Sequence, residues 1–275
     1  MTGGGGHHFA LCTLHSALSN LPGRVHVAKD RDGLFDDLAR ALWGAAGAAI
    51  DARGVFHLAL SGGSTPEPFY VHLIIDPRYR LIPWDKTHVW LVDERRVALD
   101  DARSNFRMIK ETLTDHVPMR SRQVHPVPVE ADDPGKAYES ELNRVFAESP
   151  ASAAASMRAG ATPRLDFVLL GMGDDGHTAS LFPESPALRE RSRWIVINGG
   201  PSVTPPPRVT MTYPLINAAR DVAVLVTGAK KTATLRRVDE QFRAAGPGPA
   251  TLPITGIDPA NGELTWYLDP DAAGR

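Results

Sequence analysis

Short apolar runs and longer amphipathic segments alternate along this chain. Residues 24–28 alternate apolar and polar side chains, and six further runs are short and mostly apolar, which is typical of β-strands. The predicted strands are residues 24–28, 56–60, 88–92, 167–170, 194–197, 222–226 and 264–267. Residues 34–50 repeat apolar side chains at helical spacing and are rich in Ala and Leu. The predicted helices are residues 34–50, 104–113, 135–146 and 230–242.

This alternation predicts an α/β fold, with a mainly parallel, twisted, Rossmann-like sheet covered by helices on both faces. We expect a single domain over residues 23–275, because no internal segment is long or polar enough to be a convincing linker. Residues 1–22 are predicted to form a mobile N-terminal extension. Residues 148–163 and 199–207, the first rich in Ala and Ser and the second in Pro, are predicted to be surface loops.

Composition narrows the classes of partner. The formal net charge is −2, with 30 basic and 32 acidic residues, so no overall charge draws the chain to nucleic acid or to an anionic membrane. Cys12 is the only cysteine, which excludes an internal disulfide framework and a cysteine-based metal cluster. No apolar run approaches the roughly 20 residues of a membrane span, and the N-terminus lacks the basic start of a secretory signal. We therefore expect a cytoplasmic protein.

A glycine-rich turn follows the apolar run 167–170 and carries Asp175 and His177 two residues apart. Open α/β folds bind ligands at the carboxyl ends of their parallel strands. An imidazole with a carboxylate close enough to orient it is suited to proton transfer, so His177 is a candidate general base and Asp175 its orienting partner. The absence of an HExxH spacing and of glutamate ligands argues against a metal site here.

The same turn formally matches GxGxxG, a dinucleotide-binding pattern. Two carboxylates stand where a pyrophosphate would approach the backbone, and the next predicted strand ends without an acidic residue for a ribose. Both observations disfavour a dinucleotide. No GxxxxGK[ST] phosphate loop occurs in the sequence.

A second glycine turn, residues 61–65, follows the predicted strand 56–60 and precedes a helix start. Convergent backbone N–H groups at such a turn can bind a phosphate, although the pattern alone also fits a tight connection. Other predicted strand ends supply charged side chains, each of which on its own could be a solvated surface group. The candidate phosphate- and substrate-binding residues are Gly62, Gly63, Ser64, Asp93, Arg95, Arg208 and Lys231.

Together these segments resemble the 6-phosphogluconolactonase family, within the larger group that includes glucosamine-6-phosphate isomerase/deaminase. The matching stretches are residues 58–66 (LALSGGSTP), 90–95 (WLVDER), 104–106 (SNF), 169–183 (LLGMGDDGHTASLFP), 205–210 (PPPRVT) and 214–217 (PLIN). They follow the order of the family and span about residues 24–270. The sequences of these motifs most resemble those of the lactonase module at the C-terminus of hexose-6-phosphate dehydrogenases. Since no dehydrogenase module precedes them here, we expect a separate lactonase.

The resemblance implies hydrolysis of 6-phospho-D-glucono-1,5-lactone to 6-phosphogluconate, downstream of glucose-6-phosphate dehydrogenase and without a metal or organic cofactor. It places the phosphate among the glycine turn, Arg95, Arg208 and Lys231, and it places the reacting carbon near His177. Asp93 would contact substrate hydroxyls or stabilise the site. We expect a monomer.

Two alternatives remain. The amino-sugar deaminases of the same group carry a glutamate five residues after the histidine. This position is Phe182 here, so a deaminase is disfavoured. The other alternative is a sugar-phosphate-binding regulator without catalysis. Such regulators usually carry a DNA-binding helix pair, and the N-terminal extension is too short and too poor in basic residues to supply one.

Overall fold

A computed structural model describes residues 18–148, 162–199, 203 and 207–275. The strands are β1 (Arg24–Val27), β2 (Phe56–Leu60), β3 (Thr87–Leu91), β4 (Asp93–Arg95), β5 (Val124–His125), β6 (Phe167–Leu170), β7 (Ile195–Asn198), β8 (Arg208–Met211), β9 (Asp221–Val226) and β10 (Glu263–Leu268). The helices are α1 (Arg31–Arg53), α2 (Glu67–Ile75), α3 (Asn105–Thr112), α4 (Pro134–Glu148), α6 (Tyr213–Ile216) and α7 (Thr232–Ala245). Most of the predicted loop 148–163, and residues 200–202 and 204–206 of the loop 199–207, lie outside the described residues.

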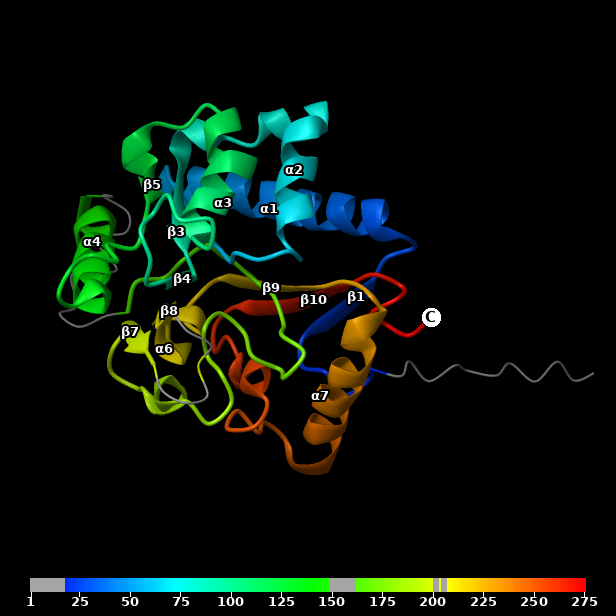
Figure 1. The fold of residues 1–275 in the computed structure, drawn as a ribbon. Coiled ribbons are helices and arrows are strands. Elements are labelled where there is room, and N and C mark those ends of the chain that lie inside the picture. The colour runs from blue at the N-terminus through cyan, green and yellow to red at the C-terminus, as the bar shows by residue number, and fades with distance from the viewer. Residues whose placement is uncertain (1–17, 149–161, 200–202, 204–206) are drawn as a thin grey trace, which may run out of the picture.

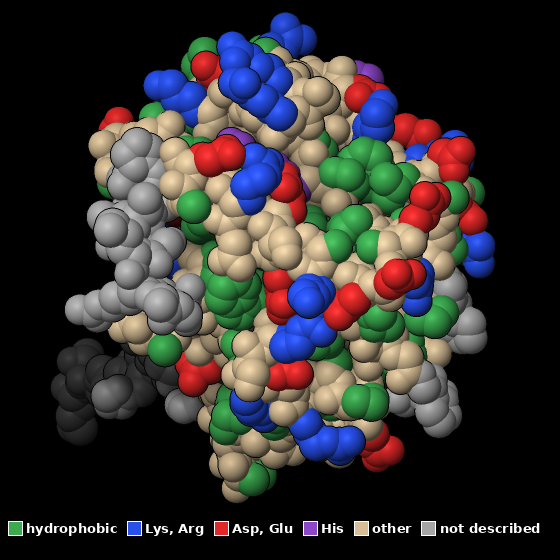
Figure 2. Space-filling view, turned by 90° about the vertical axis from the view of Figure 1, so that its left-hand side faces the viewer, with side chains coloured by type: hydrophobic (Ala, Val, Ile, Leu, Met, Phe, Trp, Pro, Cys, Tyr) green, Lys and Arg blue, Asp and Glu red, His purple; other side chains and the backbone are tan. Residues whose placement is uncertain are grey.

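Seven parallel strands form the main sheet, in the order β1-β10-β9-β6-β2-β3-β5. The predicted α/β class is thereby confirmed. β2 and β6 are buried at every position, because helices cover the sheet and leave no strand face for polar residues. Figure 1 shows α1, α2 and α3 on one side of this sheet and α7 on the other. In Figure 2, basic and acidic side chains are interspersed over one face of the molecule, in keeping with the small net charge.

A second, smaller sheet was not expected. It is antiparallel, with the order β4-β8-β7, and it contains the run at 194–197 that the pattern assigned to the mainly parallel sheet. β4 has the sequence Asp-Glu-Arg and β8 begins at an arginine. Hydrophobic periodicity cannot detect strands this short and polar, since the signal needs a longer run with one apolar face.

The direction of chain winding reverses between β2 and β6, which are neighbours in the main sheet. After β2 the chain proceeds outward to β3 and β5, whereas after β6 it proceeds the other way to β9 and β10. The connections that leave the carboxyl ends of β2 and β6 therefore diverge. Open α/β sheets have their ligand crevice at such a point, and both glycine turns singled out in the sequence begin there.

Residues 18–22 pack on the core instead of extending away from it. Leu18 and Leu21 are buried, the Asn20 N–H and side chain donate to Asp239 at 2.8 and 2.9 Å, and the Trp266 indole donates to the Pro22 carbonyl oxygen at 3.0 Å. The structure therefore differs from the expected extension over these five residues, because two leucines there can bury apolar surface. Residues 1–17 lie outside the described part. No helix in the described ranges is long and apolar enough to cross a membrane.

Candidate active site

A cavity of about 310 Å³ opens at the carboxyl ends of β2 and β6, where the chain winding reverses. This volume lies at the lower end of the range typical of small-molecule sites. Its wall is formed by the loops after β2 and β6 together with the small sheet, whose strand β4 continues from β3. The lining residues predicted from sequence are Gly62, Gly63, Ser64, Asp93, Arg95, His177, Arg208 and Lys231.

His177 lies in the turn after β6 and pairs with Asp175. The imidazole Nδ1 lies 2.6 Å from Asp175 Oδ1, and the backbone N–H of His177 donates to the same oxygen at 3.0 Å. Burial acts to raise the pKa of Asp175, but the hydrogen bonds from His177 outweigh it and hold this pKa at about 2. The carboxylate is therefore ionised at neutral pH. It accepts the proton on Nδ1 and leaves Nε2 as the nitrogen available to a ligand.

Two glycines fix the shape of this turn. Gly176 has a φ of 81°, a conformation that side-chain-bearing residues rarely adopt, and its N–H donates to the Gly173 carbonyl at 3.1 Å. Gly173 gives room to the imidazole: a Cβ at this position would stand 2.1 Å from His177 Nδ1. The three glycines that suggested a dinucleotide pattern are thus explained in part by turn geometry and by packing against His177.

Another part of the cavity lining, the donor-rich wall, is rich in hydrogen-bond donors. The turn at residues 61–65 contributes Gly62, Gly63 and Ser64, and Gly63 has a φ of 105°. Arg95, at the end of β4, and Arg208, at the start of β8, are paired opposite each other in the small sheet. Burial lowers the pKa of Arg208. Because a guanidinium group remains protonated in proteins, Arg95 and Arg208 bring two positive charges to the cavity lining.

Lys231 and Asp93 also line the cavity, each with a partner. Lys231 Nζ lies 2.5 Å from Asp174 Oδ1, an exposed carboxylate of the turn that carries His177. Asp93 is 7% exposed, and its Oδ2 accepts a hydrogen bond from the Ser180 hydroxyl at 2.5 Å. Asp175 does not line the cavity and contacts it only through His177.

Sequence reasoning missed several residues that contribute to this cavity. Asn105 and Ser180 line it, although both fall within stretches that matched the family pattern. Only the family motif could have indicated these two residues from the sequence, because an isolated Asn or Ser carries no charge pattern or periodicity. Phe182 also lines the cavity, with its ring centroid 4.7 Å from that of His177 and 5.9 Å from the Arg208 guanidinium carbon.

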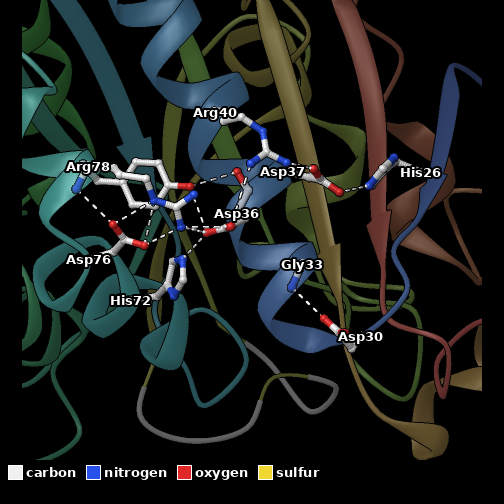
Figure 3. Close-up of polar contacts among 10 residues, drawn as sticks. His26, Asp30, Gly33, Asp36, Asp37, Arg40, His72, Asp76 and Arg78 are labelled. Carbon is white, nitrogen blue, oxygen red and sulfur yellow. Dashed lines mark hydrogen bonds and ion pairs between the residues drawn. The ribbon is translucent and has the colours of Figure 1, made fainter.

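A separate cluster of titratable groups lies where α1 meets α2 (Figure 3). Asp36, His72 and Asp76 are the one set of histidine and carboxylate groups, among the residues that the structure describes, close enough together to share an ion. Arg78 already donates to both carboxylates, with Nη2 at 2.8 Å from Asp36 Oδ1 and 2.5 Å from Asp76 Oδ2. The cluster therefore reads as a charge network that joins α1 to α2.

Comparison with known proteins identifies the family. Residues 29–266 match the family described as glucosamine-6-phosphate isomerases/6-phosphogluconolactonase. The chain belongs to this family. A 6-phosphogluconolactonase from Synechocystis sp. is 41% identical over 227 residues, which cover 82% of this chain and 86% of that protein.

Other family members vary in length and in sequence distance. The human GDH/6PGL endoplasmic bifunctional protein is 39% identical over 239 residues, and the match covers 87% of this chain but only 29% of that protein. The chain thus spans less than a third of this relative. The solved structure of a 6-phosphogluconolactonase from Trypanosoma cruzi superimposes with a TM-score of 0.75 at 27% identity, covering 92% of this chain and 96% of the other.

Proposed function

We propose that this chain hydrolyses 6-phospho-D-glucono-1,5-lactone to 6-phosphogluconate. One observation carries the proposal: a single cavity, in a member of this family, joins an aspartate-paired histidine to a wall of backbone amides and arginines. The reaction needs both features, because one end of the substrate is a doubly charged phosphate and the other is an ester carbon. We propose no metal and no organic cofactor for this step.

The phosphate is proposed to bind at the donor-rich wall. Arg95 and Arg208 present planar guanidinium groups that suit phosphate oxygens, and the turn at Gly62, Gly63 and Ser64 can add backbone N–H donors. Lys231 adds a further cation if the phosphate displaces or shares its contact with Asp174. Held in this way at its sixth carbon, the substrate has its C1 carbonyl directed toward His177.

His177 is proposed to act as the general base. Nε2 removes a proton from a water molecule as the water oxygen forms a bond to C1 of the lactone. When the bond between C1 and the ring oxygen breaks, the same proton moves from Nε2 to that oxygen, which becomes a hydroxyl group. Asp175, ionised and bonded to Nδ1, stabilises the imidazolium formed between the two steps. Proton transfer of this kind typically contributes about 10²–10⁴ in rate.

Asp93 is proposed to contact the sugar hydroxyl groups. It is nearly buried beside the cavity, and Ser180 already donates to one of its oxygens. The remaining acceptor positions of the carboxylate suit hydroxyl donors. This role would distinguish the sugar from a bare phosphate and orient the ring between the two ends of the cavity.

The deaminase alternative is disfavoured by the side chain at position 182. In the resembling deaminases a glutamate there assists ring opening, whereas here an aromatic ring packs 4.7 Å from His177. A phenyl group can neither donate nor accept a proton. We therefore favour lactone hydrolysis over deamination of an amino sugar as the activity of this chain.

The test follows lactone consumption by the purified chain, with the lactone generated in place by glucose-6-phosphate dehydrogenase and spontaneous hydrolysis subtracted. We expect hydrolysis well above the spontaneous rate, and no ammonia from glucosamine 6-phosphate. Ammonia release without lactone hydrolysis would support the deaminase. Binding of 6-phosphogluconate with no turnover of either compound would support a sugar-phosphate-binding regulator.

We also propose a monomer that acts in the cytoplasm after glucose-6-phosphate dehydrogenase. The small net charge and the interspersed surface charges give no reason to expect a nucleic-acid partner. Size-exclusion chromatography with light scattering tests the oligomeric state, and fractionation of cells tests the location.

A further inference from the structure

A buried carboxylate, that of Glu94, collects four hydrogen bonds behind the cavity, where β4 meets α3. Its Oε1 accepts from the backbone N–H groups of Arg95 at 2.7 Å and Asn105 at 2.8 Å. Its Oε2 accepts from the backbone N–H of Phe106 at 2.7 Å and from the Ser104 hydroxyl at 3.0 Å. The side chain is 0% exposed. Glu94 therefore ties the first turn of α3 to the strand that carries Arg95.

Asn105, the first residue of α3, extends these contacts to the cavity. Its side-chain Oδ1 accepts from Nη1 of Arg95, and its Nδ2 donates to the Asp93 carbonyl oxygen at 2.8 Å. The same amide lies directly against Gly62, where a Cβ would come within 1.9 Å of Oδ1. One buried amide therefore contacts both the arginine and the glycine turn of the donor-rich wall.

These contacts form a continuous chain from a group outside the cavity to groups that line it. Glu94 is not among the lining residues, whereas Asn105, Arg95 and Gly62 are. An arginine that is held in place before the ligand arrives loses less conformational entropy on binding than a mobile one. Fixing the start of α3 thus acts on affinity and not only on stability.

We propose that Glu94 is a positioning residue for the anion in this cavity. It fixes Asn105, which in turn sets Arg95 and the Gly62 turn so that their donors converge on one phosphate group. The identity of that phosphate as part of the substrate rests on the proposed function, but the chain of contacts does not depend on it.

The variant Glu94→Gln tests this role. A glutamine places an NH₂ group opposite backbone N–H donors, so the start of α3 must shift and Arg95 loses its fixed position. We expect the Kd of 6-phosphogluconate, measured by calorimetry, and the KM of the lactone to rise about tenfold, as for the loss of one charge-assisted hydrogen bond. We expect kcat to stay close to the wild-type value, because contacts equal in ground and transition states change KM alone.

Asp166→Asn is the matched control for a general loss of stability. Asp166 is likewise a buried carboxylate, 2% exposed, and it accepts from the His57 N–H at 2.8 Å and from Arg53 at 2.6 Å. It precedes β6, at the end of the sheet opposite the cavity. We expect this variant to lower the thermal midpoint while Kd and KM remain at wild-type values. A rise in Kd equal to that of Glu94→Gln would overturn the positioning role.

Asn105→Ala keeps the proposal testable if Glu94→Gln fails to fold, since it leaves the backbone contacts of Glu94 in place. We expect it to raise Kd by a similar factor. The Kd of 6-phosphogluconate for the double variant should be no higher than that of the single variant with the higher Kd, because both changes interrupt the same chain of contacts. The proposal would be overturned if the increases in Kd caused by the two substitutions multiplied in the double variant, or if neither substitution changed Kd.

Failure of the proposed function gives a different result. A wild-type chain that binds 6-phosphogluconate without hydrolysing the lactone overturns the lactonase, while the Kd values of the variants still decide the role of Glu94. A wild-type chain that neither binds 6-phosphogluconate nor hydrolyses the lactone overturns both.

Discussion

At the scale of single residues, the proposed chemistry depends on the packing of one imidazole. The pairing of Asp175 with His177 was predictable, because a tight turn brings the side chains of two residues so close in sequence within hydrogen-bonding distance. The dependence of His177 on Gly173 was not predictable. Only the folded turn shows that the ring lies where a side chain at position 173 would be.

Gly173→Ala therefore provides a test at this scale. The added methyl group would stand 2.1 Å from His177 Nδ1 and 2.8 Å from Asp175 Oδ1, so the imidazole must move. We expect kcat on the lactone to fall by about 10² or more, the lower bound of a general-base contribution, with little change in the Kd of 6-phosphogluconate. Gly47→Ala, where nothing lies within 4 Å of the new Cβ, is the control. Unchanged turnover in Gly173→Ala would show that the position of the ring does not limit the reaction.

At the scale of elements, the sequence predicted the large parallel strands well and the polar ones poorly. β2 and β6 match the expected ranges because a fully buried strand is a dense apolar run. β4 and β5 have three and two residues, and pairing with distant segments alone defines them. Two cations of the cavity lie on short strands of the small sheet, Arg95 on β4 and Arg208 on β8. These residues could be named from motifs, but their convergence required the fold.

Three neighbouring strands also carry a group of histidines, of which His57 and His125 are buried and His88 is half-buried. His88 Nδ1 lies 2.9 Å from His125 Nε2, and His125 Nδ1 lies 3.1 Å from Glu141 Oε1. The ring of His57 stacks on Phe146 with a centroid distance of 4.0 Å. Burial lowers the pKa of each of these three histidines, that of His125 to about 4.

This group predicts a loss of stability in mild acid. The unfolded chain takes up protons at these histidines near pH 6.5, whereas the folded chain resists until lower pH, so the unfolded state binds more protons in between. The contribution of these histidines to the free energy of unfolding is therefore fully present above about pH 6.5. It falls as the pH drops toward 4, by at most about 1.4 kcal/mol per pH unit for each histidine.

Urea unfolding between pH 7.5 and pH 4.5 measures this effect. His125→Gln, which cannot take up the proton, should show a shallower decline over the same range than the wild type. Equal slopes for the two proteins, or a wild-type stability that stays constant from pH 6.5 to 5, would contradict the assignment.

At the scale of the whole molecule, the folded unit begins earlier than the sequence pattern indicated. Leu18 and Leu21 join the core, and Asn20 links this segment to Asp239 of α7. Hydrophobic periodicity could not identify so short a segment, because five residues give no period. We propose that residues 18–22 belong to the same domain as residues 23–275.

Two truncations test this boundary. A chain that starts at residue 18 should keep the contacts of both leucines, whereas one that starts at residue 23 loses them. We expect the shorter chain to be less stable than the longer one by about 3 kcal/mol or more, since each buried leucine contributes roughly 1.5–3 kcal/mol. Urea unfolding of both chains gives the difference, and equal free energies of unfolding would place residues 18–22 outside the domain.

The most direct test of the central claim is the kcat of His177→Ala on enzymatically generated 6-phosphogluconolactone, with spontaneous hydrolysis subtracted. We predict a fall of about 10²–10⁴, together with a nearly unchanged Kd of 6-phosphogluconate, because the phosphate-binding wall is intact. A variant that retains the wild-type kcat would contradict the assignment of His177 as the general base.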